Sequence, residues 1–125
     1  MKLPNEHQAV MPYLMLNKAN EFYAFTRTVF NAEETLRKLR DDEKTIMHSE
    51  IQINGNTIMY CDATDEWKPQ TANLFIYVED ADITFKKAQD AGAEIVMPLN
   101  NQDYGRTCGV KDPFGNTWWI TATNE

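Results

Sequence analysis

Residues 104–121, YGRTCGVKDPFGNTWWIT, decide the fold because they predict two strands joined by a tight turn. In the turn sequence Asp112-Pro113-Phe114-Gly115, Asp suits the first position, Pro the second, and Gly the place that favours positive φ. Side chains alternate along a strand, so Trp118 and Trp119 must point to opposite faces. One tryptophan therefore enters a core, and the other faces a second environment. The strands flanking the turn are residues 106–111 and the β-branched and aromatic residues 117–121.

Composition predicts a single acidic domain. The chain has 125 residues and a net charge of −7, which argues against nucleic acid and anionic membranes as partners because both attract basic surfaces. Cys61 and Cys108 lie in predicted strands and are expected to be buried free thiols. No apolar run approaches the ~18 residues of a membrane span. The first residues lack the apolar stretch of a signal peptide, so a cytoplasmic protein is expected.

The first half of the chain predicts a strand, a helix and further strands. Phe22, Phe25 and Val29 recur at helical spacing after Asn20, which can cap a helix running to about residue 30. Local propensity favours a helix over residues 33–40. A strong hairpin signal, Asn54-Gly55, joins two of the later strands. The predicted strands are residues 10–17, 46–53 and 57–62, followed by a polar linker over 63–72.

The second half repeats this plan at an offset of about sixty residues. Leu14-Met15-Leu16-Asn17 aligns with Ile76-Tyr77-Val78-Glu79, and Gly55-Asn56-Thr57 aligns with Gly115-Asn116-Thr117. By this analogy, residues 33–40 become a strand against their local propensity. We therefore predict an α+β fold of two βαβββ modules, at about 10–62 and 73–122, within one domain. The second module is predicted from a strand at 73–79, a helix at 80–91, a short strand at 93–97, a loop at 100–103 and the closing hairpin.

These motifs together resemble the vicinal oxygen chelate superfamily, which includes glyoxalase I, bleomycin-resistance proteins and extradiol dioxygenases. The similarity is greatest to the small PhnB-like branch. It implies that each module curls its sheet around a cleft, with its helix packed on the outside, and that the protein is a homodimer. The stretches that carry the resemblance are residues 11–14, 30–34, 47–51, 77–82, 91–93, 104–106 and 112–118.

The resemblance also identifies four positions where metal-dependent members hold a cation. By register these are Met11, Met59, Asn73 and Trp119. Hard and borderline cations prefer histidine and carboxylate ligands, and none of the four is His, Glu or Asp. We therefore expect no metal site here, with a divalent metal ion as the alternative.

Strand parity predicts that the cleft is lined by aromatic and methionine side chains. Such a lining suits a planar or apolar small molecule. The alternative is that these residues pack across a dimer seam or fill the cleft. Arg106 is a candidate anchor for an anionic ligand or, equally, a partner in a surface salt bridge. The predicted ligand-binding residues are Tyr13, Met59, Asn73, Phe75, Tyr77, Arg106 and Trp119.

His48 and Glu50 are the candidate catalytic residues, since they share one strand face two residues apart. A histidine–carboxylate pair can move a proton near neutral pH, or supply half of an unusual metal site. The alternative is a polar face without chemistry. His7 is expected at the surface of an N-terminal tail. The leading hypothesis is a metal-free domain that binds a small apolar or aromatic molecule. The alternatives are a lyase or isomerase using His48 and Glu50, and a dimer without a ligand.

Overall fold

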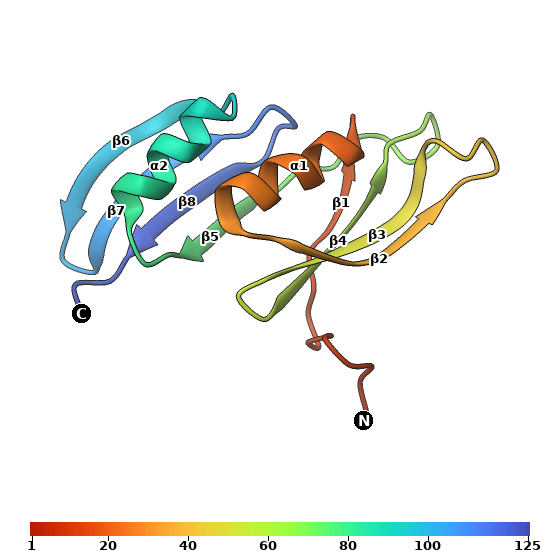
Figure 1. Ribbon diagram of the computed structural model, residues 1–125, viewed down its shortest axis with the longest axis horizontal. Coiled ribbons are helices and arrows are strands. Elements are labelled where there is room, and N and C mark those ends of the chain that lie inside the picture. The colour runs from red at the N-terminus through yellow and green to blue at the C-terminus, as the bar shows by residue number, and fades with distance from the viewer. The chain divides into compact units, whose positions relative to one another are not determined.

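The computed structural model describes residues 1–125, which form two compact units, Met1–Thr71 and Ala72–Glu125. The first unit is a four-stranded sheet in the order β1-β4-β3-β2, with β1 parallel to β4 and the other pairs antiparallel. One helix covers one face of this sheet (Figure 1). Its elements are β1 Tyr13–Leu16, α1 Ala19–Phe30, β2 Glu33–Leu39, β3 Ile46–Ile53 and β4 Asn56–Asp62.

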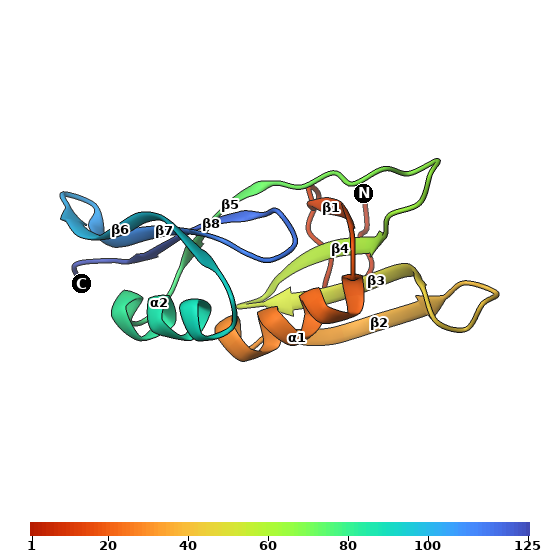
Figure 2. The same ribbon diagram turned by 90° about the horizontal axis from the view of Figure 1, so that it is seen from above.

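The second unit has the same topology, with the order β5-β8-β7-β6 and one parallel pair, β5 with β8. Within this unit, α2 covers one face of the sheet (Figure 2). The predicted α+β fold of two βαβββ modules is confirmed, including the strand β2 that the repeat predicted against local propensity. The elements are β5 Asn73–Tyr77, α2 Ala81–Asp90, β6 Glu94–Gln102, β7 Gly105–Lys111 and β8 Thr117–Ala122.

Several predicted boundaries differ from the structure. The strands predicted at 10–17 and 73–79 are shorter, at Tyr13–Leu16 and Asn73–Tyr77. Asn20 does not cap α1, which begins one residue earlier, and the first helical N–H, on Ala19, donates to Asp62 Oδ1 at 2.9 Å. The side chain of Asp62, which is distant in sequence, therefore satisfies the helix N-terminal N–H that a local cap was expected to satisfy. The strand predicted at 93–97 continues to Gln102, because irregularities in its pairing with β7 let it run through Pro98.

The turn that predicted the fold is built around the carboxylate of Asp112, which is only 3% exposed. Its Oδ1 accepts from the backbone N–H groups of Phe114 and Asn116, each at 2.9 Å. Its Oδ2 accepts from Asn116 Nδ2 at 3.1 Å and from Trp118 Nε1 at 2.8 Å. This one carboxylate therefore accepts from the backbone N–H groups of the turn and also from the indole N–H of Trp118, a core residue that is 1% exposed.

Both cysteines are buried free thiols, as predicted. Burial raises the pKa of the Cys61 thiol, and it raises the pKa of Cys108 to about 11. Neither thiol is therefore poised as a nucleophile. Neither helix has the length and apolar character needed to span a membrane.

Candidate functional site

Each sheet has an outer face, which we define as the face that its helix does not cover. In the second unit the outer face is aromatic. Trp119 is half-buried there, opposite Phe75 in the ladder, whereas its neighbour Trp118 lies in the core. Phe75 and Tyr77 are 53% and 57% exposed, and their rings meet edge to face at 5.2 Å. The predicted opposite orientation of the two tryptophans is therefore found.

Trp119 is held in place by two neighbours. Its Nε1 donates to Asn73 Oδ1 at 3.1 Å. Its ring lies over Gly109, where an added Cβ would come within 2.5 Å of the ring atom Cζ3. The absence of a side chain at Gly109 is what lets the indole lie flat on the sheet.

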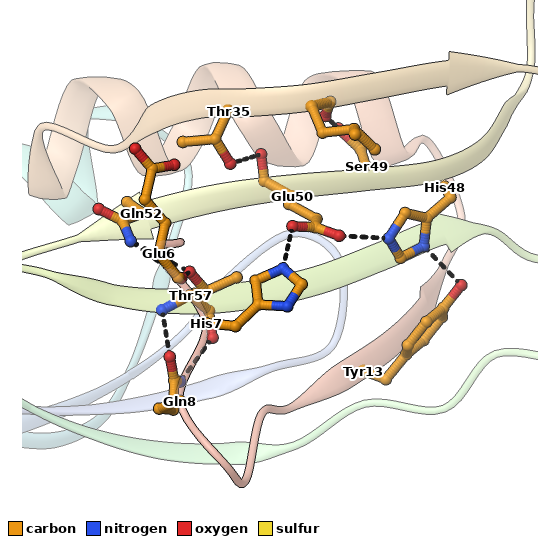
Figure 3. A network of polar contacts seen from close by, with 11 residues as sticks. Glu6, His7, Gln8, Tyr13, Thr35, His48, Ser49, Glu50, Gln52 and Thr57 are labelled. Atoms are coloured by element: carbon orange, nitrogen blue, oxygen red, sulfur yellow. Dashed lines mark hydrogen bonds and ion pairs between the residues drawn. The ribbon is translucent and has the colours of Figure 1, made fainter. Parts of the chain in front are cut away.

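In the first unit the outer face holds a chain of hydrogen bonds that we call the Glu50 network (His7, Glu50, His48 and Tyr13). Glu50 Oε1 lies 2.7 Å from His7 Nε2, and its Oε2 lies 2.7 Å from His48 Nε2. The other ring nitrogen of His48, Nδ1, lies 2.9 Å from Tyr13 Oη. Figure 3 shows the four side chains in sequence, with the carboxylate between the two imidazoles.

Glu50 is ionised in this network. Burial to 9% exposure opposes its charge, but the hydrogen bonds from His48 and His7 outweigh burial and lower its pKa. Burial is also the main cause that raises the pKa of Tyr13, so its hydroxyl stays protonated. The array can therefore store and relay a proton between side chains. Both carboxylate oxygens are already occupied by imidazoles.

His7 was expected at the surface of a tail, and the structure corrects this. The segment that carries it is fastened to β3 and β4 by polar contacts on both sides. Gln8 exchanges two hydrogen bonds with the backbone of Thr57, at 2.9 and 3.1 Å. Gln52 Nε2 and the Thr57 hydroxyl both donate to the carbonyl of Glu6. These long-range bonds give the tail a fixed position, and they bring His7 to Glu50.

A pocket of about 770 Å³ lies within the first unit beside the Glu50 network. Its volume is typical of small-molecule sites. The polar lining residues are Arg40, Thr64, Asp65 and Glu66. The apolar and aromatic lining residues are Tyr13, Met15, Met47, Cys61 and Trp67.

Met47 and Trp67 were not predicted to line the cleft. Strict alternation along residues 46–53 puts Met47 on the same face as Ser49 and Ile51, but β2 and β3 slip by one residue between Leu39–Ile46 and Lys38–His48. This bulge turns Met47 outward, where it is half-exposed, and leaves Ile46 in the core. Trp67 lies in the predicted linker. Two hydrogen bonds of 2.8 Å fix this part of the linker. The backbone N–H of Thr64 donates to the carbonyl of Trp67, and the backbone N–H of Trp67 donates to Thr64 Oγ1.

The positions where relatives hold a metal do not fit a cation in this chain. In the first unit, Met11 and Met59 offer only thioether sulfur, which suits soft ions. In the second unit, the Asn73 amide oxygen already accepts the indole N–H of Trp119, and an indole is not a ligand. Neither unit holds a group of three or more His, Cys, Asp or Glu side chains arranged for a metal ion.

Arg106 is engaged in the surface ion pair that was its alternative assignment. Its Nε and Nη2 donate to the two carboxylate oxygens of Asp82, at 2.9 and 3.2 Å. Donating hydrogen bonds to Asp82 raises the pKa of Arg106, and accepting them from Arg106 lowers the pKa of Asp82. An anionic ligand at Arg106 would have to displace Asp82.

Known proteins share this fold over nearly the whole chain. An uncharacterized protein of Mycobacterium bovis is 32% identical over 126 residues, which cover 91% of this chain and 82% of that protein. The PhnB protein from Bacillus cereus is 22% identical with a TM-score of 0.73, over 93% of this chain and 100% of that one. TnmS3, an antibiotic binding protein from Streptomyces sp. CB03234, is 14% identical with a TM-score of 0.69, over 94% and 100%. The sequence model of one family matches residues 7–120. The chain belongs to the Glyoxalase/Bleomycin resistance protein/Dioxygenase superfamily, as its motifs indicate.

Proposed function

We propose that this protein is a small-molecule-binding domain that holds an apolar or aromatic ligand without a metal ion. The observation that carries the proposal is the pocket of about 770 Å³ in the first unit, with Tyr13 and Trp67 as aromatic walls and methionines between them. Aromatic rings supply rigid stacking surfaces, and methionine adapts to irregular shapes. At the four family metal positions, the donors are thioether, amide and indole groups, which favour such a ligand over a hard cation.

The aromatic outer face of the second unit supports the same proposal. Large exposed aromatic side chains are costly to leave in water unless they serve an interaction. Phe75, Tyr77 and Trp119 supply such a surface, and Asn73 fixes the indole. We therefore keep as the proposed ligand-binding residues Tyr13, Met59, Asn73, Phe75, Tyr77, Arg106 and Trp119.

We also propose that the two modules act as one domain and that the working form is a cytoplasmic homodimer. The similarity to TnmS3 is compatible with binding, because that protein is described as an antibiotic binding protein. At 14% identity the comparison establishes the fold alone. The binding role therefore depends on the residues of this chain.

Tryptophan fluorescence tests the proposal directly. A panel of planar aromatic compounds is titrated against the protein, and quenching of Trp67 or Trp119 is expected for at least one. Trp67→Ala and Trp119→Ala should each remove the quenching that comes from its own unit. Tyr23→Phe on α1 is the control and should change nothing. If no compound alters emission or binds by calorimetry, the binding proposal fails.

The second candidate is a lyase or isomerase that uses His48 and Glu50, with or without a divalent metal ion. It is favoured by the Glu50 network, in which an ionised carboxylate orients an imidazole next to the pocket. Metal analysis of protein purified without chelator separates the two candidates. One tight equivalent of Zn, Ni, Mn or Fe per chain would favour the enzyme and contradict the metal-free binding domain.

A further inference from the structure

We propose that the pocket of the first unit selects aromatic ligands that donate a hydrogen bond, such as phenols and aryl N–H compounds, and that Tyr13 Oη accepts this bond. The inference rests on the proposed binding function and names its ligand class. It follows from which atom donates and which atom accepts in each hydrogen bond of the Glu50 network. It also follows from the polar groups around the pocket.

The direction of the network begins at Glu50. An ionised carboxylate can only accept hydrogen bonds, so His7 and His48 must each present an N–H at Nε2 to it. Neutral His48 then has an unprotonated Nδ1, which can only accept. The Tyr13 hydroxyl lies 2.9 Å away and donates its single proton there. Within the network, only His48 bonds directly to Tyr13. Toward the pocket, Tyr13 therefore presents only oxygen lone pairs.

The other polar groups at the pocket are also mostly acceptors. Asp65 and Glu66 are exposed and form no hydrogen bond or ion pair within the chain, so their carboxylates are free to accept. The one cation, Arg40, already donates from Nη2 to the carbonyl of Asp62 at 2.8 Å. Two carboxylates against one guanidinium leave the rim negative. An aromatic carboxylate would meet repulsion there, whereas a phenol or aryl N–H would meet acceptors.

The apolar walls require the donor to be carried on a planar ring. Two hydrogen bonds with Thr64 fix the backbone of Trp67, and its ring, 57% exposed, lines the pocket. Met15 and Met47 line the same pocket and can adapt to a ring of moderate size. Tyr13, 43% exposed, lines the same pocket. Stacking and one directed hydrogen bond together define the ligand class.

The test uses two neutral probes of the same shape. The probe 2-naphthol carries an O–H donor, whereas 2-methoxynaphthalene has only an acceptor at that position, and 2-naphthoate adds the anionic case. Isothermal titration calorimetry should show 2-naphthol binding roughly three- to ten-fold more tightly than the ether. The naphthoate should bind most weakly.

Two variants locate the effect. Tyr13→Phe should abolish the preference for the naphthol while both probes still bind, and Tyr23→Phe on α1 should keep the preference. His48→Leu removes the acceptor for the Tyr13 proton, so the affinity of the ether should rise relative to that of the naphthol. If neither probe binds and no compound of the aromatic panel binds, the proposed function fails, and if only other panel compounds bind, the ligand class is wrong. If both bind equally, or Tyr13→Phe keeps the preference, the ligand class is wrong and the binding function stands.

Discussion

The outer faces of the two units carry opposite chemistry at matching positions of the same sheet. In the first unit, Met59 pairs with Tyr13 on one side and Glu50 on the other. In the second, Trp119 pairs in the same way with Phe75 and Gly109. A buried carboxylate with two imidazole partners therefore corresponds to a glycine beneath an indole.

The comparison shows which part of the repeat is constrained. On the helix-covered faces both units keep large apolar side chains, such as Tyr60 against Phe22 and the buried Trp118 and Ile120. Packing density limits change there. The outer faces are free of that limit, so one became a polar network and the other an aromatic surface. A repeated scaffold can in this way supply two different recognition surfaces.

The two hairpin turns should differ most in their contribution to stability. Asp112→Ala removes the acceptor of four hydrogen bonds in the second unit. We expect the free energy of unfolding to fall by about 3–5 kcal/mol, because buried donors lose their partner. The matched change in the first unit is Asn54→Ala, at a residue with φ 49° whose carbonyl accepts from Asn56 Nδ2 at 3.4 Å and whose own side chain forms no hydrogen bond. It should cost only about 1 kcal/mol. Urea denaturation measures both, and equal losses would contradict this account of the second turn.

Glu50→Gln should make the first unit less stable and less sensitive to acid. A glutamine amide cannot accept from both imidazoles, so we expect a loss of about 1.5–3 kcal/mol at neutral pH. The pKa of Glu50 is lowered in the fold. The unfolded chain therefore takes up this proton first as the pH falls, and the stabilisation is lost below about pH 4.3.

The measurement for Glu50 is the unfolding free energy of both proteins between about pH 7 and pH 3. The difference in unfolding free energy between wild type and Glu50→Gln should be constant above the pH range in which carboxyl groups titrate, and it should become smaller below that range. Asp42 and Asp82, whose pKa values are also lowered by hydrogen bonds, are present in both proteins and cancel. A difference that grows in acid would show that the network does not stabilise the ionised carboxylate.

The sequence predicted the repeat better than it predicted the site. Period-two alternation correctly placed Trp118 in the core and Trp119 outside, because the side-chain period of a strand is fixed by geometry. The same rule failed at Met47, since a bulge inserts one residue and inverts the parity before it. No local signal announces that bulge, which depends on pairing with a distant strand.

The other residues missed at the site were missed for related reasons. His7 reaches Glu50 only because Gln8 and Gln52 fasten its segment to strands more than forty residues away, as the separations of 49 and 46 show. Trp67 looked like part of a linker. Its signal was present, because Thr64 three residues earlier can form the hydroxyl turn that fixes it.

Gly109→Ala tests whether the aromatic face depends on the missing side chain. The new Cβ would lie 2.5 Å from Trp119 Cζ3, so the ring must tilt and lose its bond to Asn73. We expect a loss of about 1–2 kcal/mol and a red-shifted tryptophan emission. Trp119→Leu combined with Gly109→Ala should recover most of the stability, because the ring that clashes is gone. Unchanged emission in the single variant would show that the ring does not rest on Gly109.

Asp82→Ala should have the smallest effect on stability, and it tests charge recognition at Arg106, which lies on the side of the second sheet that α2 covers. Asp82 and Arg106 are exposed, and such ion pairs contribute little to folding, so the melting temperature should not change measurably. Removing Asp82 frees a guanidinium at the second unit, whereas the rim of the first-unit pocket keeps its two carboxylates. Binding of 2-naphthoate should therefore rise about two- to three-fold and fall again with added salt, while 2-naphthol binding stays constant. Calorimetry with both probes at low and high salt measures these changes in affinity. A gain for the naphthol as well would show that removing Asp82 changes the shape of the second unit and not only the charge at Arg106.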